Sequence, residues 1–368
     1  MRVDVVDPSA YTPPYDHALC AALARAGAQV RLVTSRFAYG PVPREEGYEV
    51  RESFYRLAVG PPGSRTRQAA KLAQEVPDML RYRRAAREAD IVHLQWLTVQ
   101  PLDVHLLPND RPLVLTAHDL LPREPRPGQL GAQRRLYERV DAVLVHSHHG
   151  RERLVVDLDV DPERVHVVPH GAFEYLTRLP DEAPLPAGLA QVEGPVVLCF
   201  GLMRPYKGID VLIDAWRGIG GAELWIVGLP KMPIGPLRAA APPGVRFVPR
   251  FITDAEIPAY FRRADLVVLP YRQIDQSGVL FTALAFGKPM LLSGVGGFPE
   301  IAEAGAAELF AVDDRAALHI ALQRLLADPA RRERLAAGAH AAAAGAYSWD
   351  EAAARTLAVY RRLIEPPA

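Results

Sequence analysis

The sequence predicts two successive α/β domains, each with a parallel sheet that carries helices on both faces. Short apolar segments typical of buried strands alternate with amphipathic segments typical of helices, from residue 2 to residue 310. The chain has 368 residues, which is longer than a single hydrophobic core normally serves. Residues 173–194, rich in Pro, Glu and Leu, interrupt the alternation and are interpreted as a linker.

The expected elements fall on either side of that linker. The first domain is placed at residues 1–175, with a helix at about 16–26, for which Asp16 could be the N-cap, and a strand or hairpin at 48–57. Its other strands are expected at 2–6, 29–34, 91–94, 113–116, 142–145 and 165–168. The second domain is placed at 194–347. Its strands are expected at 196–199, 223–227, 245–248, 266–269, 290–293 and 308–310, and its helices at 209–217, 254–263, 279–286 and 314–326.

The amino-acid composition limits the classes of function and the cellular compartment that are expected for this protein. Lys plus Arg and Asp plus Glu each total 43, so the formal net charge is zero and nothing favours nucleic acid as a partner. Two cysteines in so long a chain fit a reducing compartment. The chain enters a strand pattern at its start, without a signal peptide, and no apolar run is long enough to span a bilayer. A cytoplasmic protein is expected.

A basic stretch at residues 65–87 has two interpretations. Its apolar residues recur at roughly helical spacing and are interrupted at Pro77, so it reads as a solvated helix pair. Alternatively it touches anionic lipid headgroups at the inner face of the membrane. Glu75 and Asp78 dilute the positive charge, which favours the first interpretation.

The turn at residues 200–210 has the composition of an anion site. It joins an apolar strand to a helical segment and contains Gly201, Arg204, Lys207 and Gly208. Glycines let the backbone approach a ligand, and two fixed positive charges suit a phosphate or diphosphate. An ordinary connecting loop with two solvated bases is the alternative.

Three further loops follow strands of the second domain, and the carboxyl ends of parallel strands share one sheet edge. The candidates for donor contacts in these loops, with the turn above, are Gly201, Arg204, Lys207, Arg250, Phe251, Ile252, Gln276, Ser277, Gly278, Val279, Leu280, Thr282 and Glu300. Residues 250–252 are placed to pack on a flat base. Residues 278–280 open a helix whose N–H groups could hold phosphate oxygens. Together the loops describe a nucleoside-diphosphate site.

These loops resemble those of the family-4 glycosyltransferases, the retaining group with the GT-B fold. The resemblance rests on Phe200-Gly201…Arg204-Pro-Tyr-Lys207-Gly208, on 264–271, on Gly287-Lys288-Pro289 and on 296–300. In the first half it rests on Thr116-Ala-His118-Asp119 and 167–171. It implies two Rossmann-like domains facing an interdomain cleft, with a closing helix at about 348–368 that packs back on the first domain. It also implies a UDP- or GDP-sugar donor, a glycan, lipid-linked or small-molecule acceptor, and neither metal nor cofactor.

Residue roles follow from this resemblance. Arg204 and Lys207 match the pair that binds the donor diphosphate, and His118 matches a catalytic histidine, so these three are the catalytic candidates. Tyr15, Asp16, His17, His118 and Asp119 are expected to contact the acceptor at the carboxyl edge of the first sheet.

The sequence departs from the family pattern where two glutamates are usual, because Ile274 and Thr282 stand there. Gln276, Ser277 or Thr282 would have to replace the ribose contact. Two alternatives therefore stay open: a sugar-nucleotide epimerase of the same fold, and a nucleotide-sugar-binding module without activity.

Overall fold

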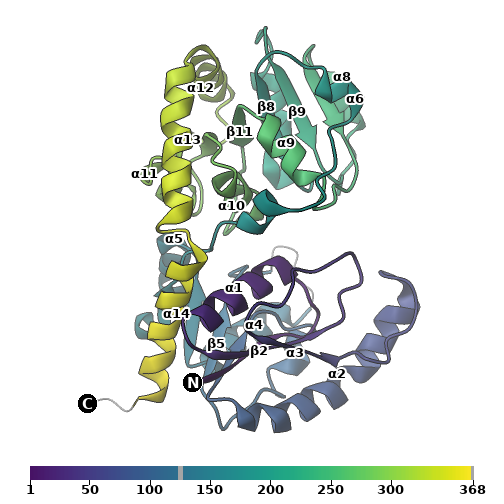
Figure 1. Ribbon diagram of the computed structural model, residues 1–368, viewed down its shortest axis with the longest axis vertical. Coiled ribbons are helices and arrows are strands. Elements are labelled where there is room, and N and C mark those ends of the chain that lie inside the picture. Colours follow the sequence, from purple (N-terminus) through teal and green to yellow (C-terminus); the bar gives the residue numbers. More distant parts are fainter. Residues whose placement is uncertain (123–126, 366–368) are drawn as a thin grey trace. The chain divides into compact units, whose positions relative to one another are not determined.

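The computed structural model describes residues 1–122 and 127–365. Its contacts divide the chain into two compact units. The first unit contains residues 1–171 together with the C-terminal segment from Trp349, and the second contains Ala172–Ser348. Both are layered α/β structures with a central sheet (Figure 1).

The sheet of the first unit is parallel throughout, with strand order β3-β2-β1-β4-β5-β6-β7. Its strands are β1 (Arg2–Asp7), β2 (Gln29–Ser35), β3 (Glu49–Phe54), β4 (Ile91–Leu94), β5 (Leu113–Thr116), β6 (Ala142–Val145) and β7 (Val165–Val167). Its helices are α1 (Pro13–Arg25), α2 (Arg65–Ala85), α3 (Gln100–Asp103), α4 (Gln129–Arg139), α5 (His148–Glu152) and α14 (Trp349–Ile364).

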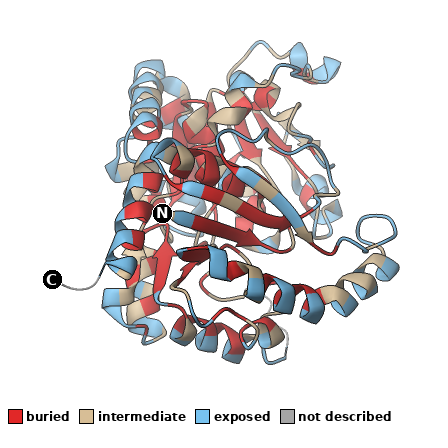
Figure 2. Cartoon of the chain, turned by 60° about the horizontal axis from the view of Figure 1, so that its bottom comes forward, coloured by how far each residue is buried: buried red, intermediate tan, exposed pale blue. Residues whose placement is uncertain are grey.

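Side chains that alternate along these strands enter two different cores. Val92 and Leu94 pack with α2 and α4, whereas Ile91 packs with α1 and α14 on the other face. Figure 2 shows the strands mostly buried between helices whose outer sides are exposed. The sheet is thus covered on both faces, which is typical of parallel sheets.

The second unit repeats this architecture with strand order β10-β9-β8-β11-β12-β13. Its strands are β8 (Val196–Phe200), β9 (Glu223–Val227), β10 (Val245–Val248), β11 (Leu266–Leu269), β12 (Met290–Ser293) and β13 (Ala307–Phe310). Its helices are α6 (Ala187–Ala190), α7 (Ile209–Ala215), α8 (Gly235–Ala240), α9 (Ile257–Arg263), α10 (Gly278–Ala285), α11 (Phe298–Glu303), α12 (Arg315–Ala327) and α13 (Pro329–Ala344). Helices α7 and α12 cover one face, and α9, α10 and α13 the other.

The structure differs from the local expectations at three places and resolves one open alternative. Residues 65–85 form one continuous helix with Pro77 inside it rather than a helix pair. Of the two alternatives for residues 48–57, the strand is confirmed, since Glu49–Phe54 pairs in parallel with β2. The alanine-rich helix α13 was not expected, because its weak hydrophobic periodicity gives little signal. Residues 173–194, interpreted as a linker, place Leu176 and Leu189 in the core of the second unit.

Candidate functional site

In the second unit, the predicted loops meet at the point where the strand order reverses. Strands β8 and β11 are neighbours, but the chain leaves β8 toward β9 on one side and β11 toward β12 on the other. The loops after β8 and β11 therefore diverge and leave room for a ligand at the carboxyl edge of the sheet. The turn at 200–210 follows β8, and the segment 271–280 follows β11.

Lys207 links these two loops. Its Nζ donates a hydrogen bond to the Tyr271 hydroxyl at 2.8 Å and lies 4.7 Å from the centre of the Tyr271 ring. The side chain is buried, with 7% exposed. A Cβ on Gly201, whose φ is +109°, would lie only 2.9 Å from Nζ and 3.0 Å from the Val279 side chain. Glycine is therefore required here, and the predicted Gly201, Lys207 and Val279 lie together.

Tyr271, which the site prediction did not include, is held from several sides. The Ser293 hydroxyl at the end of β12 donates to the Tyr271 carbonyl at 2.5 Å. The Tyr271 ring lies edge-on to Tyr206 at 6.0 Å and tilted against Phe298 at 5.5 Å. This packing fixes the hydroxyl that positions the Lys207 amine.

Arg272, which was also not among the predicted site residues, holds the turn at 200–210 through several hydrogen bonds. Its backbone N–H donates to the Tyr206 carbonyl at 2.7 Å, and its guanidinium donates to the Pro205 carbonyl at 2.9 Å. The same group forms a bidentate pair with Asp210, at 2.9 and 2.7 Å. Gly208 (φ +62°) completes the joint, since a Cβ there would lie 2.0 Å from the Pro270 carbonyl oxygen. The β8 turn is thus rigidly attached to the loop after β11.

The start of α10 supplies backbone donors beside Lys207. The first N–H groups of a helix have no helical acceptors. The Leu280 N–H bonds the Ser277 carbonyl at 3.0 Å, and the Leu280 side chain is in the core. Within the described part of the chain, the N–H groups of Gly278 and Val279 have no acceptor. These two donors could face an anion.

The remaining residues that are predicted to contact the sugar donor differ in hydrogen bonding and burial. The Thr282 hydroxyl donates to the Gly278 carbonyl at 2.9 Å inside its own helix, whereas Gln276 is half-buried. Arg204 is half-buried in the β8 turn, and Glu300 is half-buried in the first turn of α11.

The predicted base-binding residues follow β10. Phe251 presents an exposed ring, with 59% of the residue exposed, whereas Ile252 is buried in the core. Arg250 is paired with Glu256 at 2.6 Å. Phe251 is therefore the member of this group most available to pack on a base.

The first unit gathers aromatic and imidazole rings at its own reversal point, between β1 and β4. Tyr15 on α1 is at the centre of this cluster. Its ring lies 4.6 Å from His118, 5.4 Å from His146, 4.9 Å from His170 and 5.1 Å from Trp349. Trp96 stacks on His118 at 5.0 Å with a 9° interplanar angle.

A chain of hydrogen bonds fixes the tautomer of His118. His118 Nε2 lies 3.0 Å from Gln95 Oε1, and Gln95 Nε2 lies 3.2 Å from His93 Nε2. His93 Nδ1 lies 2.5 Å from the Tyr360 hydroxyl of α14. Since an amide oxygen only accepts, Nε2 of His118 carries the hydrogen. Its Nδ1 is then the acceptor nitrogen.

Burial keeps these histidines neutral. Burial, and then the like charges of His146, His170 and His93, lower the pKa of His118 well below its usual value of 6.5. Burial lowers the pKa of His146 to about 4, even though its Nδ1 donates to the Val168 carbonyl at 3.0 Å. At pH 7 the cluster therefore offers polar contacts without positive charge.

The other predicted acceptor residues surround this cluster. Asp16 is buried beside Asp7, and burial followed by the charge of Asp7 raises the pKa of Asp16 well above 3.8. His17 Nδ1 lies 2.6 Å from the Tyr48 hydroxyl, and burial lowers the pKa of His17 to about 4. Asp119 follows His118 and is half-buried.

Trp96, His146, His170 and Trp349 were not predicted as site residues. The first three follow β4, β6 and β7, so the strand-end rule that selected His118 applies to them as well. Trp349 carried no such signal, because it joins the cluster only through the packing of α14 on α1. Among the residues that the structure describes, no group of His, Cys, Asp and Glu is arranged to hold a metal ion.

Comparison with known proteins identifies the family. Residues 15–172 match the family described as Glycosyltransferase Family 4, and residues 194–328 match Glycosyl transferases group 1. The chain is 30% identical over 312 residues to D-inositol 3-phosphate glycosyltransferase 1 of Catenulispora acidiphila, a match that covers 77% of this chain and 74% of that protein.

Solved structures share the fold. Sucrose-phosphate synthase from Thermosynechococcus elongatus aligns with a TM-score of 0.73 at 20% identity, covering 99% of both chains. Anabaena HepE, crystallised with UDP-glucose, aligns with a TM-score of 0.69 at 21% identity, covering 98% of this chain and 100% of that one. The two parallel-sheet units and these neighbours confirm the predicted GT-B fold. The chain belongs to the family-4 glycosyltransferases.

Proposed function

We propose that this glycosyltransferase moves a sugar from a nucleoside diphosphate to an acceptor hydroxyl. The observation that carries the proposal is the buried Lys207 amine, fixed on Tyr271 beside Gly201 and the start of α10. A preorganised cation next to backbone donors stabilises charge that develops on a leaving phosphate. Arg204, in the same turn, adds a second positive charge.

The proposed donor is a UDP- or GDP-sugar. HepE, which has the same fold, was crystallised with UDP-glucose. In this chain the diphosphate would contact Lys207, Arg204 and the N–H groups of Gly278 and Val279, while Phe251 would pack on the base. Gln276 and Ser277 are the candidates to replace the family's ribose contact, because the Thr282 hydroxyl already has an acceptor.

The proposed reaction retains the anomeric configuration and needs no metal ion. The bond between the sugar C1 and the diphosphate oxygen breaks, and its electron pair stays on that oxygen. The acceptor oxygen bonds to C1 from the same face, and its proton passes to the departing phosphate. Lys207 and Arg204 would supply positive charge that a divalent cation supplies in other enzymes. His118 would use its neutral Nδ1 to accept a hydrogen bond from a sugar or acceptor hydroxyl.

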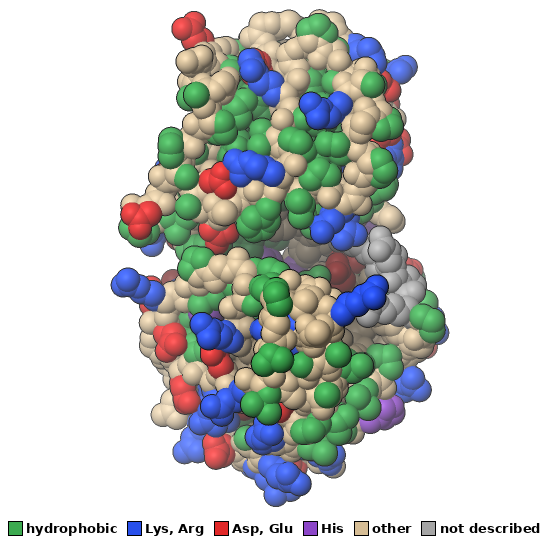
Figure 3. Space-filling view, turned by 90° about the vertical axis from the view of Figure 1, so that its right-hand side faces the viewer, with side chains coloured by type: hydrophobic (Ala, Val, Ile, Leu, Met, Phe, Trp, Pro, Cys, Tyr) green, Lys and Arg blue, Asp and Glu red, His purple; other side chains and the backbone are tan. Residues whose placement is uncertain are grey.

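We further propose that α2 rests on an anionic membrane surface on the cytoplasmic side. Leu72, Val76 and Leu80 recur every four residues and are exposed, at 60%, 37% and 37%. Glu75 and Asp78, which dilute the charge in the sequence, are buried and bonded to Tyr55. Asp78 also pairs with Arg81 at 2.6 Å and offsets that base, whereas Arg83 and Arg84 form no ion pair with either acid. Figure 3 shows Lys and Arg side chains beside hydrophobic ones on the first unit. The helices in the described part of the chain include no candidate membrane span.

Vesicle binding tests the membrane contact. The full chain should sediment with phosphatidylglycerol vesicles and not with phosphatidylcholine vesicles. The double variant R83E/R84E should lose most of this binding, since each base near an anionic surface contributes about 1 kcal/mol. R134E/R135E, an equal charge change on α4, is the matched control. Equal losses in both variants would contradict a specific role for α2.

Donor turnover tests the reaction. The protein is incubated with a panel of UDP- and GDP-sugars, with and without EDTA, and the free nucleoside diphosphate is measured. Slow release without acceptor, faster release with acceptor, and insensitivity to EDTA are expected. Proton NMR of the product should show the anomeric configuration of the donor. Binding of a donor without release or transfer would favour the inactive binding module, and an epimerised donor would favour the epimerase.

A further inference from the structure

A hollow of about 690 Å³ lies along the outer edge of the first sheet, entirely within the first unit. Strand β7 is the last strand of that sheet, and the hollow is lined by β7, α5 and the C-terminal helix α14. Its floor is apolar, since Val165, Val168 and Val359 are 3%, 2% and 5% exposed. The residues predicted to contact donor or acceptor are not among those that line it.

Basic side chains predominate in the wall of this hollow. Five of the lining residues are basic: His148 and Arg151 of α5, His166 of β7, and Arg355 and Arg362 of α14. Among the lining residues that the structure describes, Glu163 is the one acid. The wall therefore has the charge that attracts an anion.

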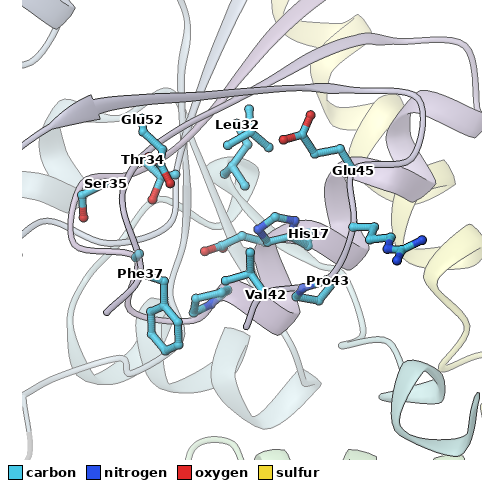
Figure 4. A pocket seen from close by; sticks show the side chains of 14 residues that line it. His17, Leu32, Thr34, Ser35, Phe37, Val42, Pro43, Glu45 and Glu52 are labelled. Carbon is cyan, nitrogen blue, oxygen red and sulfur yellow. The ribbon is translucent and has the colours of Figure 1, made fainter. Parts of the chain in front are cut away.

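A hollow of about 370 Å³ at the carboxyl edge of β1, β2 and β3 has the opposite character. Figure 4 shows Glu45 and Glu52 on its wall, and Asp16 and Arg44 line it as well. Three carboxyl groups thus accompany one guanidinium there, beside the candidates for acceptor contacts. The excess of basic groups belongs to the outer edge of the sheet and not to the edge that carries the transfer site.

Arg151 is held in place by backbone carbonyls. Its Nε donates to the Val165 carbonyl at 3.2 Å, and a terminal N–H group donates to the Pro162 carbonyl at 3.1 Å. Within the described residues it forms no ion pair. A guanidinium has five N–H donors, so Arg151 keeps both its charge and spare donors for a ligand.

Arg362 and His166 are less constrained still. In the part of the chain that the structure describes, neither side chain has a hydrogen-bond partner. Burial, and then the positive charges of Arg362 and Arg151, lower the pKa of His166 below its usual value of 6.5. The two guanidinium groups therefore lie close to the same imidazole. Arg355 pairs with Glu351 at 2.6 Å, but both partners are exposed, and such pairs contribute little.

Strand β7 adds a backbone donor at this edge. The Val168 N–H donates to the Val145 carbonyl of β6 at 2.8 Å. Backbone groups of successive residues point to alternate sides along a strand, so the N–H of Val167 points away from β6, toward the open edge. The Val165 carbonyl, on that same side, is the one that accepts from Arg151.

The length of the basic wall indicates the size of the anion. Arg355 and Arg362 are seven residues apart on one face of α14, which separates their Cα atoms by about 10 Å along the helix axis. Ala358 and Val359 lie between them on that face. A row of charges of this length suits several linked phosphate groups better than one.

We infer that this hollow binds a condensed phosphate, an anion of two or more linked phosphate groups, and that the bound anion ties α14 to α5 and β7. Guanidinium groups suit phosphate oxygens because their N–H donors match pairs of oxygens. The anion could be an inorganic polyphosphate or the phosphate chain of a nucleotide, and the chemistry of recognition is the same for both. The site does not depend on the proposed transfer reaction.

Calorimetric titration of the full chain with pyrophosphate tests the site. The Lys207→Ala variant is used as background, so that the donor turn contributes little, at about 150 mM salt to screen weak surface attraction. Pyrophosphate and tripolyphosphate should each bind once per chain, about tenfold more tightly than orthophosphate. Failure of pyrophosphate to bind, or citrate binding as tightly as pyrophosphate, would overturn the inference.

Arg362→Glu and Arg361→Glu, made in the same background, form a matched pair. The two residues are neighbours on α14, both are exposed, and only Arg362 lines the hollow. Arg362→Glu should weaken pyrophosphate binding about tenfold or more, as expected for a lost charge-assisted hydrogen bond. Arg361→Glu should weaken it less than about twofold. Equal losses would mean general attraction to a basic helix and would contradict a defined site.

Hydrogen exchange measures the second part of the inference. A ligand that bridges three elements opposes their separation, so saturating pyrophosphate should slow amide exchange in residues 355–362 about tenfold. Helix α12, in the second unit, is the internal reference and should not change. Unaltered exchange in α14 while pyrophosphate is bound would refute the tie between α14 and the sheet edge.

Nucleoside triphosphates resolve the source of the phosphate groups. Tighter binding of ATP or UTP than of tripolyphosphate would assign the apolar floor of Val165, Val168 and Val359 to a nucleoside. Equal or weaker binding would assign the hollow to inorganic polyphosphate. In both cases Arg362→Glu should reduce the affinity by the same factor as it does for pyrophosphate.

Discussion

The reversal points of the two sheets differ sharply in chemistry although they share one topology. In the second unit, Lys207 and Arg204 sit in a turn braced by Arg272 and Tyr271. In the first unit, Tyr15, Trp96 and neutral histidines form a packed cluster. One edge therefore supplies fixed positive charge, and the other supplies uncharged hydrogen-bonding groups.

This difference suits the two halves of a group transfer. A departing diphosphate gains negative charge and is stabilised by preorganised cations. An acceptor hydroxyl needs orientation more than charge, and a histidine held in one tautomer provides that. The comparison predicts that changes at the cationic edge have the largest effects.

Lys207→Ala should have the largest effect, lowering donor turnover about 10³-fold by removing the buried cation. The measurement is nucleoside-diphosphate release under saturating donor. Lys288→Ala is the control, because Lys288 precedes β12 at the opposite edge and bonds the Arg262 carbonyl at 3.0 Å. Near-normal turnover of Lys207→Ala would refute the site assignment.

His118→Ala should reduce sugar transfer about 10²-fold, since it removes a positioned hydrogen-bonding group. Donor affinity should change less than threefold, because the cations of the second unit remain. Transfer is followed by product formation and donor affinity by calorimetry. The exposed His105→Ala serves for comparison, and an equal loss in that variant would argue against a specific role for His118.

Gln95→Leu should lower kcat for transfer about tenfold without changing the KM for donor. Gln95 is not expected to touch donor or acceptor. It fixes the tautomer of His118 through the 3.0 Å hydrogen bond between Gln95 Oε1 and His118 Nε2. Gln95→Glu keeps an acceptor oxygen and should retain more activity than Gln95→Leu. Equal losses in the two variants would indicate a packing role only.

The first unit should also respond to pH through buried carboxyls. Burial, followed by the charge of Glu75, raises the pKa of Asp103 to about 8. A raised folded pKa means that this group's stabilisation is lost as pH rises from about 4 to about 8. The lowered histidine pKa values act oppositely, but only as pH falls from 6.5 to about 4.

Between pH 6.5 and 8 the raised pKa values of Asp103 and Asp16 should therefore outweigh the histidines, and Asp103 alone should lower stability by roughly 1–2 kcal/mol. Asp103→Asn should flatten that decline, because an amide can keep the bond from the Val99 N–H, now 2.7 Å. The free energy of unfolding is measured by urea denaturation at several pH values. An unchanged slope in the variant would exclude Asp103 as the titrating group.

Thr282→Val should have the smallest effect, changing donor KM less than twofold, because the hydroxyl bonds its own helix. Gln276→Ala should raise donor KM about fivefold if Gln276 replaces the missing glutamate contact. The two KM values, measured side by side, discriminate these residues. The opposite ranking would return the ribose contact to Thr282.

Much of the fold could be predicted because local patterns carry it. The strands from 223 to 227, 245 to 248, 266 to 269 and 290 to 293 match the observed bounds, since each is a short apolar run between turn residues. The helix break predicted at Pro77 was wrong, because a helix that is held by its packing can accommodate a single proline.

The family, the strand-end loops and the candidate pair Arg204 and Lys207 could be read from the sequence, because the motifs of a turn are local. The contact of Tyr271 with Lys207, that of Gln95 with His118 and that of Trp349 with Tyr15 are visible only in the folded chain. The burial of Glu75 and Asp78 on α2 is visible only there as well. Such contacts depend on distances between residues far apart in the chain, which no local pattern records.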